Sequence, residues 1–249
     1  MKQKVVGIIP ARYKSTRYPG KPLVKLLGKP MIIWVAELTA KALGKENVYV
    51  ATEDIRIMRV VEDFGFQAIM TPGDLLTGTD RVAYAAKNID ADIYLNIQGD
   101  EPTLDPKSII KVLEHKILNP NYIVNSMTKL NKDEDPNNIN IPKVIVNNNN
   151  EMVYMSRMAI PGYKEYANSP KYYFKQVCIY AFSKMELERF SSCSKKGSLE
   201  RHEDIEILRF LDLHLPVKML EVSGRIYAVD VPDDVAVVEG VLLKTNKIC

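Results

Sequence analysis

The loop that follows the first predicted strand of the chain is strongly basic. The first acidic residue of the chain is Glu37, so no carboxylate in the loop neutralises these charges. The apolar run 5–9, bounded by Pro10, is typical of a buried strand, and the loop therefore leaves its carboxyl end. Free backbone amides and several cations at such a strand end predict a site for a polyanion such as a triphosphate, the alternative being a solvated basic loop. The cations are Arg12, Lys14, Arg17 and Lys21.

Two later segments place carboxylates at the ends of predicted strands. Residues 93–97 form an apolar run followed by Gly-Asp-Glu-Pro, which contains Asp100. A second predicted strand, 226–229, leads to Asp230, and Pro232 then opens a helix. Carboxylate oxygens suit Mg²⁺, which a nucleoside triphosphate would bring with it. The alternative is that these acids only form turns or cap the helices that follow.

A basic loop and two strand-end aspartates together supply what phosphoryl or nucleotidyl transfer requires. The cations would hold the phosphates and neutralise the leaving group, and the aspartates would hold Mg²⁺ against the reacting phosphorus. The chain contains neither a Walker lysine motif nor a G-x-G-x-x-G fingerprint. The sequence therefore argues against a P-loop ATPase and against a dinucleotide-dependent enzyme.

The elements that position these residues alternate between strands and helices over the first half of the chain. Helical spacing begins at Pro30, at Asp54, near residue 80 and at Pro106. This alternation predicts an α/β fold with a mostly parallel sheet and helices on both faces. The strands expected between the helices are residues 48–51, 67–70 and 93–97.

The pattern changes after about residue 120. The β-prone runs 143–146 and 152–155 flank four asparagines that tolerate left-handed backbone, which predicts a hairpin. We expect one domain over 1–249, in which about 130–182 is an insertion that forms the acceptor pocket and uses the hairpin for dimerisation. The other expected elements are strands at 124–129, 172–182 and 217–222, and helices at 183–190, 199–213 and 232–243.

Composition limits the possible partners. The chain has 249 residues, is 46% hydrophobic and carries a net charge of +3 that is concentrated in the basic loop. A local anion site is expected rather than a nucleic-acid surface. The three cysteines follow no metal-binding spacing and are interpreted as free thiols in a reducing cytoplasm. No signal peptide or membrane-length apolar run is found, so we expect a soluble cytoplasmic protein.

Several ordered motifs resemble the CMP-sugar-acid synthetases, and among them the 3-deoxy-manno-octulosonate cytidylyltransferase (CMP-KDO synthetase) family. The resemblance covers nearly the whole chain and implies a nucleotidyltransferase, Rossmann-like fold that acts as a homodimer. The motifs that carry it are residues 8–12, 15–23, 78–81, 96–102, 156–157, 160–161, 179–182, 198–200, 229–230 and Pro232.

The resemblance also implies a reaction. CTP and a 2-keto-3-deoxy sugar acid would give the CMP-sugar, used for lipopolysaccharide or capsule, and pyrophosphate. Arg12, Lys21 and Asp100 would be catalytic, and Asp100 and Asp230 would bind Mg²⁺. The implied nucleotide-binding residues are Pro10, Ala11, Arg12, Ser15, Lys21, Gly78, Thr79 and Arg81, with 78–81 as a loop over base and ribose. The implied acceptor-binding residues are Arg17, Gln98, Arg157, Gln176 and Glu200.

This chain departs from the family pattern on the acceptor side. Gln176 stands where a histidine is usual, and Ile207 stands where a glutamine is usual. Losing these hydrogen-bonding groups would alter a pocket that binds sugar hydroxyls. Two alternatives therefore stay open: an enzyme that uses a different sugar acid or a small phosphorylated acceptor, and a non-catalytic nucleotide-binding protein.

We predict that Asp100→Asn leaves the fold intact and removes most turnover, because the amide cannot replace an anionic metal ligand. Circular dichroism would verify the fold, and pyrophosphate release in the presence of Mg²⁺ would measure turnover. A rate near that of the unmodified protein would contradict the assignment of Asp100.

Overall fold

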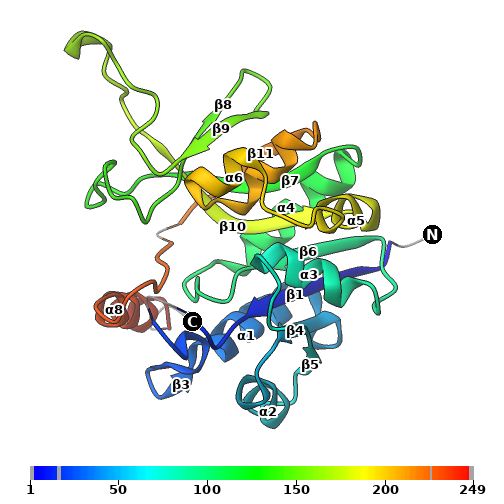
Figure 1. Cartoon of the computed structure of the whole chain (residues 1–249). Coiled ribbons are helices and arrows are strands. Elements are labelled where there is room, and N and C mark those ends of the chain that lie inside the picture. Colours follow the sequence, from blue (N-terminus) through cyan, green and yellow to red (C-terminus); the bar gives the residue numbers. More distant parts are fainter. Residues whose placement is uncertain (1–2, 16–17, 225, 247–249) are drawn as a thin grey trace.

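The strands assemble into one sheet that runs through the molecule (Figure 1). The computed structural model describes residues 3–15, 18–224 and 226–246. The main path of the sheet has the order β11-β7-β10-β6-β1-β4-β5, and β8 and β9 extend it beside β10. The strands are β1 (Val5–Ala11), β4 (Val48–Thr52), β5 (Gln67–Met70), β6 (Ile93–Ile97), β7 (Ile123–Lys129), β8 (Lys143–Val146), β9 (Met152–Ser156), β10 (Phe174–Phe182) and β11 (Val217–Glu221). A separate small ribbon contains β2 (Lys25–Leu26) and β3 (Lys29–Pro30).

The predicted mostly parallel sheet is confirmed. Strand β1 pairs in parallel with β4 and β6, β4 pairs in parallel with β5, and β11 pairs in parallel with β7. Strand β10 is antiparallel to both of its neighbours, β6 and β7. Because the other strands of the main path share one direction, their carboxyl ends meet at the same edge of the sheet.

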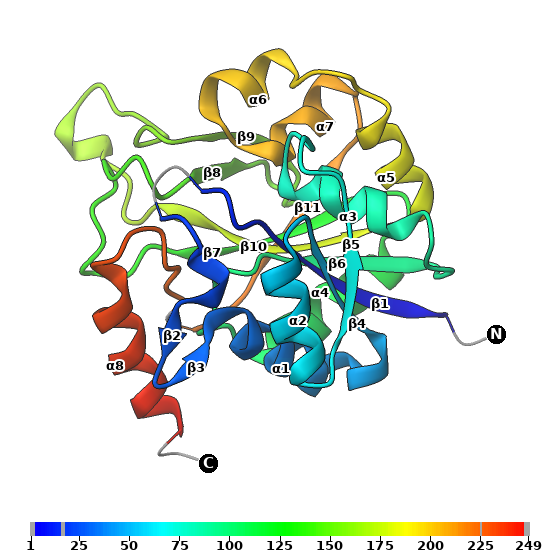
Figure 2. The same cartoon turned by 60° about the horizontal axis from the view of Figure 1, so that its bottom comes forward.

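Helices cover both faces of the sheet, and alternate residues of each strand face opposite layers. Figure 2 shows α3, α5, α6 and α7 on one face and α1, α2 and α4 on the other. Ile8 of β1 belongs to the first apolar layer, whereas Ile9 belongs to the second. The helices are α1 (Met31–Leu43), α2 (Ile55–Asp63), α3 (Gly78–Ala86), α4 (Pro106–Leu118), α5 (Lys184–Ser191), α6 (Ser198–Glu203), α7 (Arg209–Asp212) and α8 (Asp234–Asn246). Within the described ranges, no helix combines the length and apolar character needed to cross a membrane.

The predicted hairpin is present. Strands β8 and β9 pair antiparallel, and the asparagine run 147–150 connects them. Asn150 has a φ of 58°, a left-handed conformation that asparagine tolerates better than most residues. The hairpin lies at the top of Figure 1, next to a long excursion of the chain.

The predicted strand at 226–229 is wrong, because these residues form no strand. Their backbone groups bond to a loop instead. The backbone N–H of Tyr227 donates to Thr103 Oγ1, which donates back to the Tyr227 carbonyl, and the N–H of Val229 donates to the carbonyl of Asp100. Helix α8 also begins later than predicted, at Asp234, which accepts the N–H groups of Asp230 and Val231.

The single helix predicted at 199–213 is also wrong. It is divided into α6, a short 3-10 helix (Glu206–Leu208) and α7. Asp204 ends α6 with a φ of 50°. The side chain of Arg157 donates to the carbonyls of Glu203 and Asp204, which have no partner within the helix. A distant arginine, which local spacing cannot reveal, therefore caps this helix end.

A buried charge cluster joins α3 to α6 and α7. Arg209 is 1% exposed and donates to both carboxylate oxygens of Asp80, at 2.7 and 3.0 Å, and to both of Glu200, at 2.7 and 2.8 Å. Although burial by itself would lower it, the hydrogen bonds that Arg209 donates to Glu200 and Asp80 raise the pKa of Arg209. Arg209 therefore stays charged inside the fold.

We expect Arg209→Met to lower the free energy of unfolding by about 3–5 kcal/mol, because it leaves two buried carboxylates without their cation. Urea unfolding measures the change. Arg56→Met is the matched control, since it breaks an exposed arginine–aspartate pair with Asp54 and should alter stability little. Equal losses in the two variants would show that burial of the pair is not the cause.

Candidate active site

The loop after β1 folds back on itself. The N–H of Gly20 donates to the carbonyl of Tyr13 at 2.9 Å, and the φ of 72° at Gly20 suits a residue without a side chain. The N–H of Tyr13 is bound in turn by Glu53, which follows β4. This closure returns Lys21 to the edge of the sheet where the loop started.

Lys21 meets two carboxylates that come from distant parts of the chain. Its Nζ lies 2.8 Å from Asp100 Oδ2 and 3.6 Å from Asp230 Oδ1. The side chains are partly accessible, at 15% for Lys21, 30% for Asp100 and 23% for Asp230. The structure thus brings together one cation and the two acids at the carboxyl edge of the sheet, open enough for a ligand to reach.

Asp100 and its neighbour Glu101 have different environments. Glu101 is 6% exposed, and its carboxylate accepts the backbone N–H of Cys178 in β10. Burial and the nearby charge of Asp100 raise the pKa of Glu101 to about 8. At neutral pH Glu101 is therefore mostly protonated and tied to β10, whereas the side chain of Asp100 is 30% exposed and contacts Lys21.

Asp230 is held by the segment that replaces the predicted strand. Val229 packs with Leu26 and Met31 and with two residues of α8 in a small apolar cluster. Lys175 of β10 donates to the Ile226 carbonyl at 3.0 Å and pairs with Glu134. Apolar packing on one side of Asp230 and backbone hydrogen bonds along the segment thus fix its position.

The donor set at Lys21 suits a magnesium ion that arrives with its substrate. Asp100 and Asp230 offer oxygen ligands, and Lys21 contacts both. Across the described residues, no group of three or more histidine, cysteine, aspartate or glutamate side chains gathers as a complete metal cage. Mg²⁺ commonly uses one or two carboxylates together with phosphate oxygens and water, so two carboxylates fit it.

Residues 78–81 do not form the expected loop. They are the first turn of α3, capped by Thr77, whose hydroxyl accepts the N–H of Asp80. Thr79 is 1% exposed and Arg81 is 3% exposed. The guanidinium of Arg81 donates to Thr71 and pairs with Glu53 at 3.4 Å. The start of a helix therefore lies where a loop over base and ribose was predicted.

Positive charges nevertheless face this part of the site. Burial lowers the pKa of Arg81, and the charge of Arg12 lowers it further, although Glu53 opposes the change. Arg12 itself is exposed at the end of β1. The two guanidinium groups therefore lie near enough to repel each other, and Glu53 offsets part of this repulsion at Arg81.

The residues that precede Arg12 lie in the sheet. Pro10 and Ala11 end β1 and pair with Ala51 and Thr52 of β4. A side chain on Gly99 would approach the Pro10 carbonyl to 3.2 Å, so glycine allows the loop after β6 to pack against the end of β1. In the basic loop, Ser15 Oγ accepts the N–H of Tyr18 at 3.3 Å.

Glu206 is a site residue that sequence reasoning missed. It accepts the N–H of Thr79 at 2.9 Å and Nε2 of Gln98 at 2.8 Å. A Cβ on Gly78 would lie 2.8 Å from Nε2 of Gln98, so glycine makes room for this bond. Burial raises the pKa of Glu206, and the hydrogen bond from the N–H of Thr79 offsets part of this increase. The sequence contained one indication of it, because Glu206 directly precedes Ile207, a position at which this chain departs from the family pattern.

The remaining acceptor-side residues divide into three cases. Gln176 is buried in β10, and its side-chain amide donates to the hydroxyl of Tyr180. Ile207 is 1% exposed inside the apolar core, so it offers nothing to a ligand. Arg157 uses three of its five N–H groups on the carbonyls of Ile139, Glu203 and Asp204, which leaves two for a ligand.

Glu200 is placed differently from the expectation. It is fully buried, and both of its oxygens are bound by Arg209. The structure therefore gives it a role in the charge cluster rather than a surface for substrate. Arg17 lies outside the described residues.

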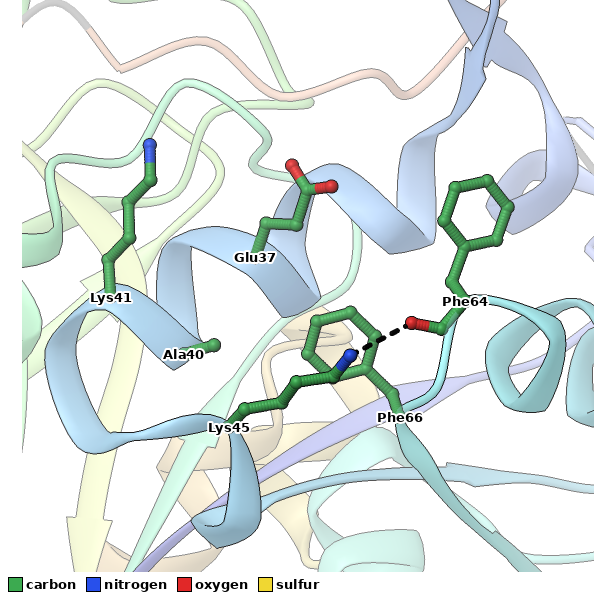
Figure 3. Close-up of a pocket in the computed structure, with 6 residues that line it drawn as sticks. All are labelled: Glu37, Ala40, Lys41, Lys45, Phe64 and Phe66. Carbon is green, nitrogen blue, oxygen red and sulfur yellow. Dashed lines mark hydrogen bonds between the residues drawn. The ribbon is translucent and has the colours of Figure 1, made fainter.

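A surface pocket of about 400 Å³ lies elsewhere, between α1 and the turn after α2 (Figure 3). Two phenylalanines and two lysines dominate its lining, and Lys45 donates to the Phe64 carbonyl at 3.1 Å. Glu37 supplies its single carboxylate, so the pocket lacks the paired acids found at Lys21.

Comparison with known proteins identifies the family. A family model described as cytidylyltransferase matches residues 6–215. A 3-deoxy-manno-octulosonate cytidylyltransferase from Chloroherpeton thalassium is 37% identical over 98% of this chain and 100% of its own. The protein of the same name from Escherichia coli is 36% identical over 92% of each chain.

A solved structure supports the same relationship. The structure described as CMP:2-keto-3-deoxy-manno-octonic acid synthetase complexed with CTP matches with a TM-score of 0.88 and 34% identity, over 97% of this chain and 99% of that one. The relatives therefore share the complete fold and not only a motif. This chain belongs to the cytidylyltransferase family of nucleotidyltransferases.

Proposed function

We propose that this protein transfers CMP from CTP to the anomeric hydroxyl of 3-deoxy-manno-octulosonate (KDO) and releases pyrophosphate. The observation that carries the proposal is the contact of Lys21 with Asp100 and Asp230 at the carboxyl edge of the sheet, in a cytidylyltransferase. Relatives named for this activity, at 36–37% identity over almost the whole chain, support KDO as the acceptor.

The proposed step is an in-line displacement. The anomeric oxygen of the sugar forms a bond to the α-phosphorus of CTP, the bond from that phosphorus to the bridging oxygen breaks, and pyrophosphate carries away the electron pair. The hydroxyl proton is lost to solvent or to a phosphate oxygen. Positive groups assist because negative charge accumulates on the phosphoryl oxygens and on the leaving group.

The basic loop holds the triphosphate in this proposal. Lys21 stabilises the transferred α-phosphoryl group, since it already contacts the two acids that face it. Arg12 and Ser15 bind the outer phosphates, and Arg81, in the first turn of α3, adds positive charge near Arg12. The base and ribose are assigned to Pro10, Ala11, Gly78 and Thr79, the last through the rigid first turn of α3.

We assign Asp100 and Asp230 as the ligands of Mg²⁺. When bound, the ion would neutralise phosphate charge and align the α-phosphorus for attack. Lys21, within 4 Å of both carboxylates, keeps them close together and oriented toward the nucleotide.

The acceptor is assigned to the opposite side of the loop after β6. Arg157 retains two N–H groups that can bind the sugar carboxylate, and Gln98 and Gln176 face hydroxyls. Glu206 joins this set through its bond to Gln98. Arg17 stays in the acceptor-binding set on the sequence resemblance alone. Glu200 is left out of this set because it is buried with Arg209.

The proposal extends to the assembly of the protein and to its location in the cell. We propose one functional unit over 1–249, with 130–182 supplying the acceptor pocket and a homodimer surface. Exposed Ile139, Val153 and Met158 in this region support such a surface. A cytoplasmic location is supported by the free thiols of Cys178 and Cys193.

The test of this function is pyrophosphate release by the purified protein with Mg²⁺. CTP with KDO should give turnover, whereas ATP, GTP or UTP with KDO should give little. Release with CTP and a sugar 1-phosphate but not with KDO would replace the proposed acceptor. Tight CTP binding without turnover on any acceptor would favour a non-catalytic nucleotide-binding protein.

A different sugar acid is the second candidate, because Gln176 replaces the usual histidine. We expect Gln176→His to shift kcat/KM toward KDO relative to other 2-keto-3-deoxy acids, by up to about tenfold, since one hydrogen-bonding group changes. Competition assays with paired acceptors measure the ratio. An unchanged ratio would show that Gln176 does not set acceptor preference.

A further inference from the structure

The amide of Asn125 lies at an irregularity between β7 and β10. Asn125 is fully buried, and its Nδ2 donates to the carbonyls of Val177 at 3.0 Å and Ile179 at 2.9 Å. The pairing of β10 with β7 shifts register between Val177 and Tyr180, so these carbonyls flank a bulge. Both N–H groups of the Asn125 amide are thus committed to backbone.

This commitment dictates the orientation of a second amide. With its nitrogen on two carbonyls, Asn125 must direct Oδ1 away from them, and Oδ1 accepts Nε2 of Gln176 at 3.0 Å. The same Nε2 donates to the hydroxyl of Tyr180 at 3.1 Å. A reversed Gln176 amide would set its oxygen against Oδ1 of Asn125, two acceptors facing each other. Gln176 therefore keeps its nitrogen inward and Oε1 as the atom left for a ligand.

The bulge also borders the loop after β6. The N–H of Cys178 donates to Glu101, and the carbonyl of Cys178 accepts the N–H of Gln98 at 3.1 Å. Gln176 itself is 8% exposed, and the bond between Cys178 and Gln98 joins this part of β10 to a residue assigned to the acceptor. The oriented amide of Gln176 thus lies on the side of the site assigned to the acceptor.

We propose that Asn125 is a positioning residue that makes Gln176 a pure hydrogen-bond acceptor, so that the pocket recognises a sugar hydroxyl through its proton. The inference rests on the proposed function. An oxygen in this place binds a hydroxyl donor and repels a carboxylate or phosphate oxygen. The pocket therefore favours an acceptor with a free hydroxyl at this position over an acceptor with a phosphate group there.

The test is Asn125→Ala, with KDO and CTP varied separately in the pyrophosphate assay. The variant frees the amide of Gln176 to rotate. KM for KDO should then rise about tenfold, which corresponds to the loss of one hydrogen bond, because the acceptor oxygen is no longer held in place. The kcat and the KM for CTP should stay within about twofold. Ser126→Ala is the matched control, since Ser126 Oγ donates to the same Val177 carbonyl but does not contact Gln176. It should leave KM for KDO unchanged.

A double-variant cycle separates positioning from general damage. Gln176→Met removes Oε1, so adding Asn125→Ala to it should raise KM for KDO no further, because both changes act through one oxygen. Should Asn125→Ala fail to fold, Asn125→Ser keeps a donor for the bulge, removes the amide oxygen and should give the same rise in KM.

The outcomes distinguish this inference from the function on which it rests. No turnover by the unmodified protein with CTP and KDO would overturn the proposed function and this inference with it. Normal turnover with an unchanged KM for KDO in Asn125→Ala, or additive effects in the double variant, would overturn the inference alone.

Discussion

The candidate site depends on an electrostatic interaction: two ionised carboxylates repel each other, and a cation that lies against both offsets this repulsion. Lys21 is this cation for Asp100 and Asp230. The three residues come from a loop after β1, a loop after β6 and a segment that precedes α8, so their meeting requires most of the fold to be in place. A nucleoside triphosphate with its metal ion supplies the same kind of charge balance, which is why this edge suits such a substrate.

Burial separates structural charges from those available to a ligand. Arg209, Asp80 and Glu200 form a closed cluster in which both carboxylates are bound by the arginine. Lys116 of α4 and Glu186 of α5 form a second buried pair, with 2.8 Å between Nζ and Oε1. At the candidate site the side chains of Lys21, Asp100 and Asp230 keep between 15% and 30% of their surface. Residue type alone does not distinguish these groups, whereas accessibility does.

The proposed acceptor side combines amides and backbone groups with the charged residues Arg157 and Glu206. A bulge in β10 orients Asn125, and Asn125 orients Gln176. The same bulge binds Gln98 and Glu101 through Cys178, and Gln98 binds Glu206. Backbone irregularity thus organises the side chains on both flanks of Asp100, because peptide groups released from the ladder must find other partners.

The sequence by itself determined most strands of the large sheet, the helices on both faces, the Asn147–Asn150 turn, the loop that carries Lys21 and the strand-end position of Asp100. These depend on local periodicity and turn chemistry, which short segments contain. Only the tertiary structure decided that 226–229 is no strand, that Arg157 caps the helix end at Glu203 and Asp204, and that Glu200 is buried with Arg209. It alone brought Glu206 and Asn125 to the site. In each case the deciding partner is a hydrogen-bonding group far away in the chain, and such a partner leaves no trace in the local pattern.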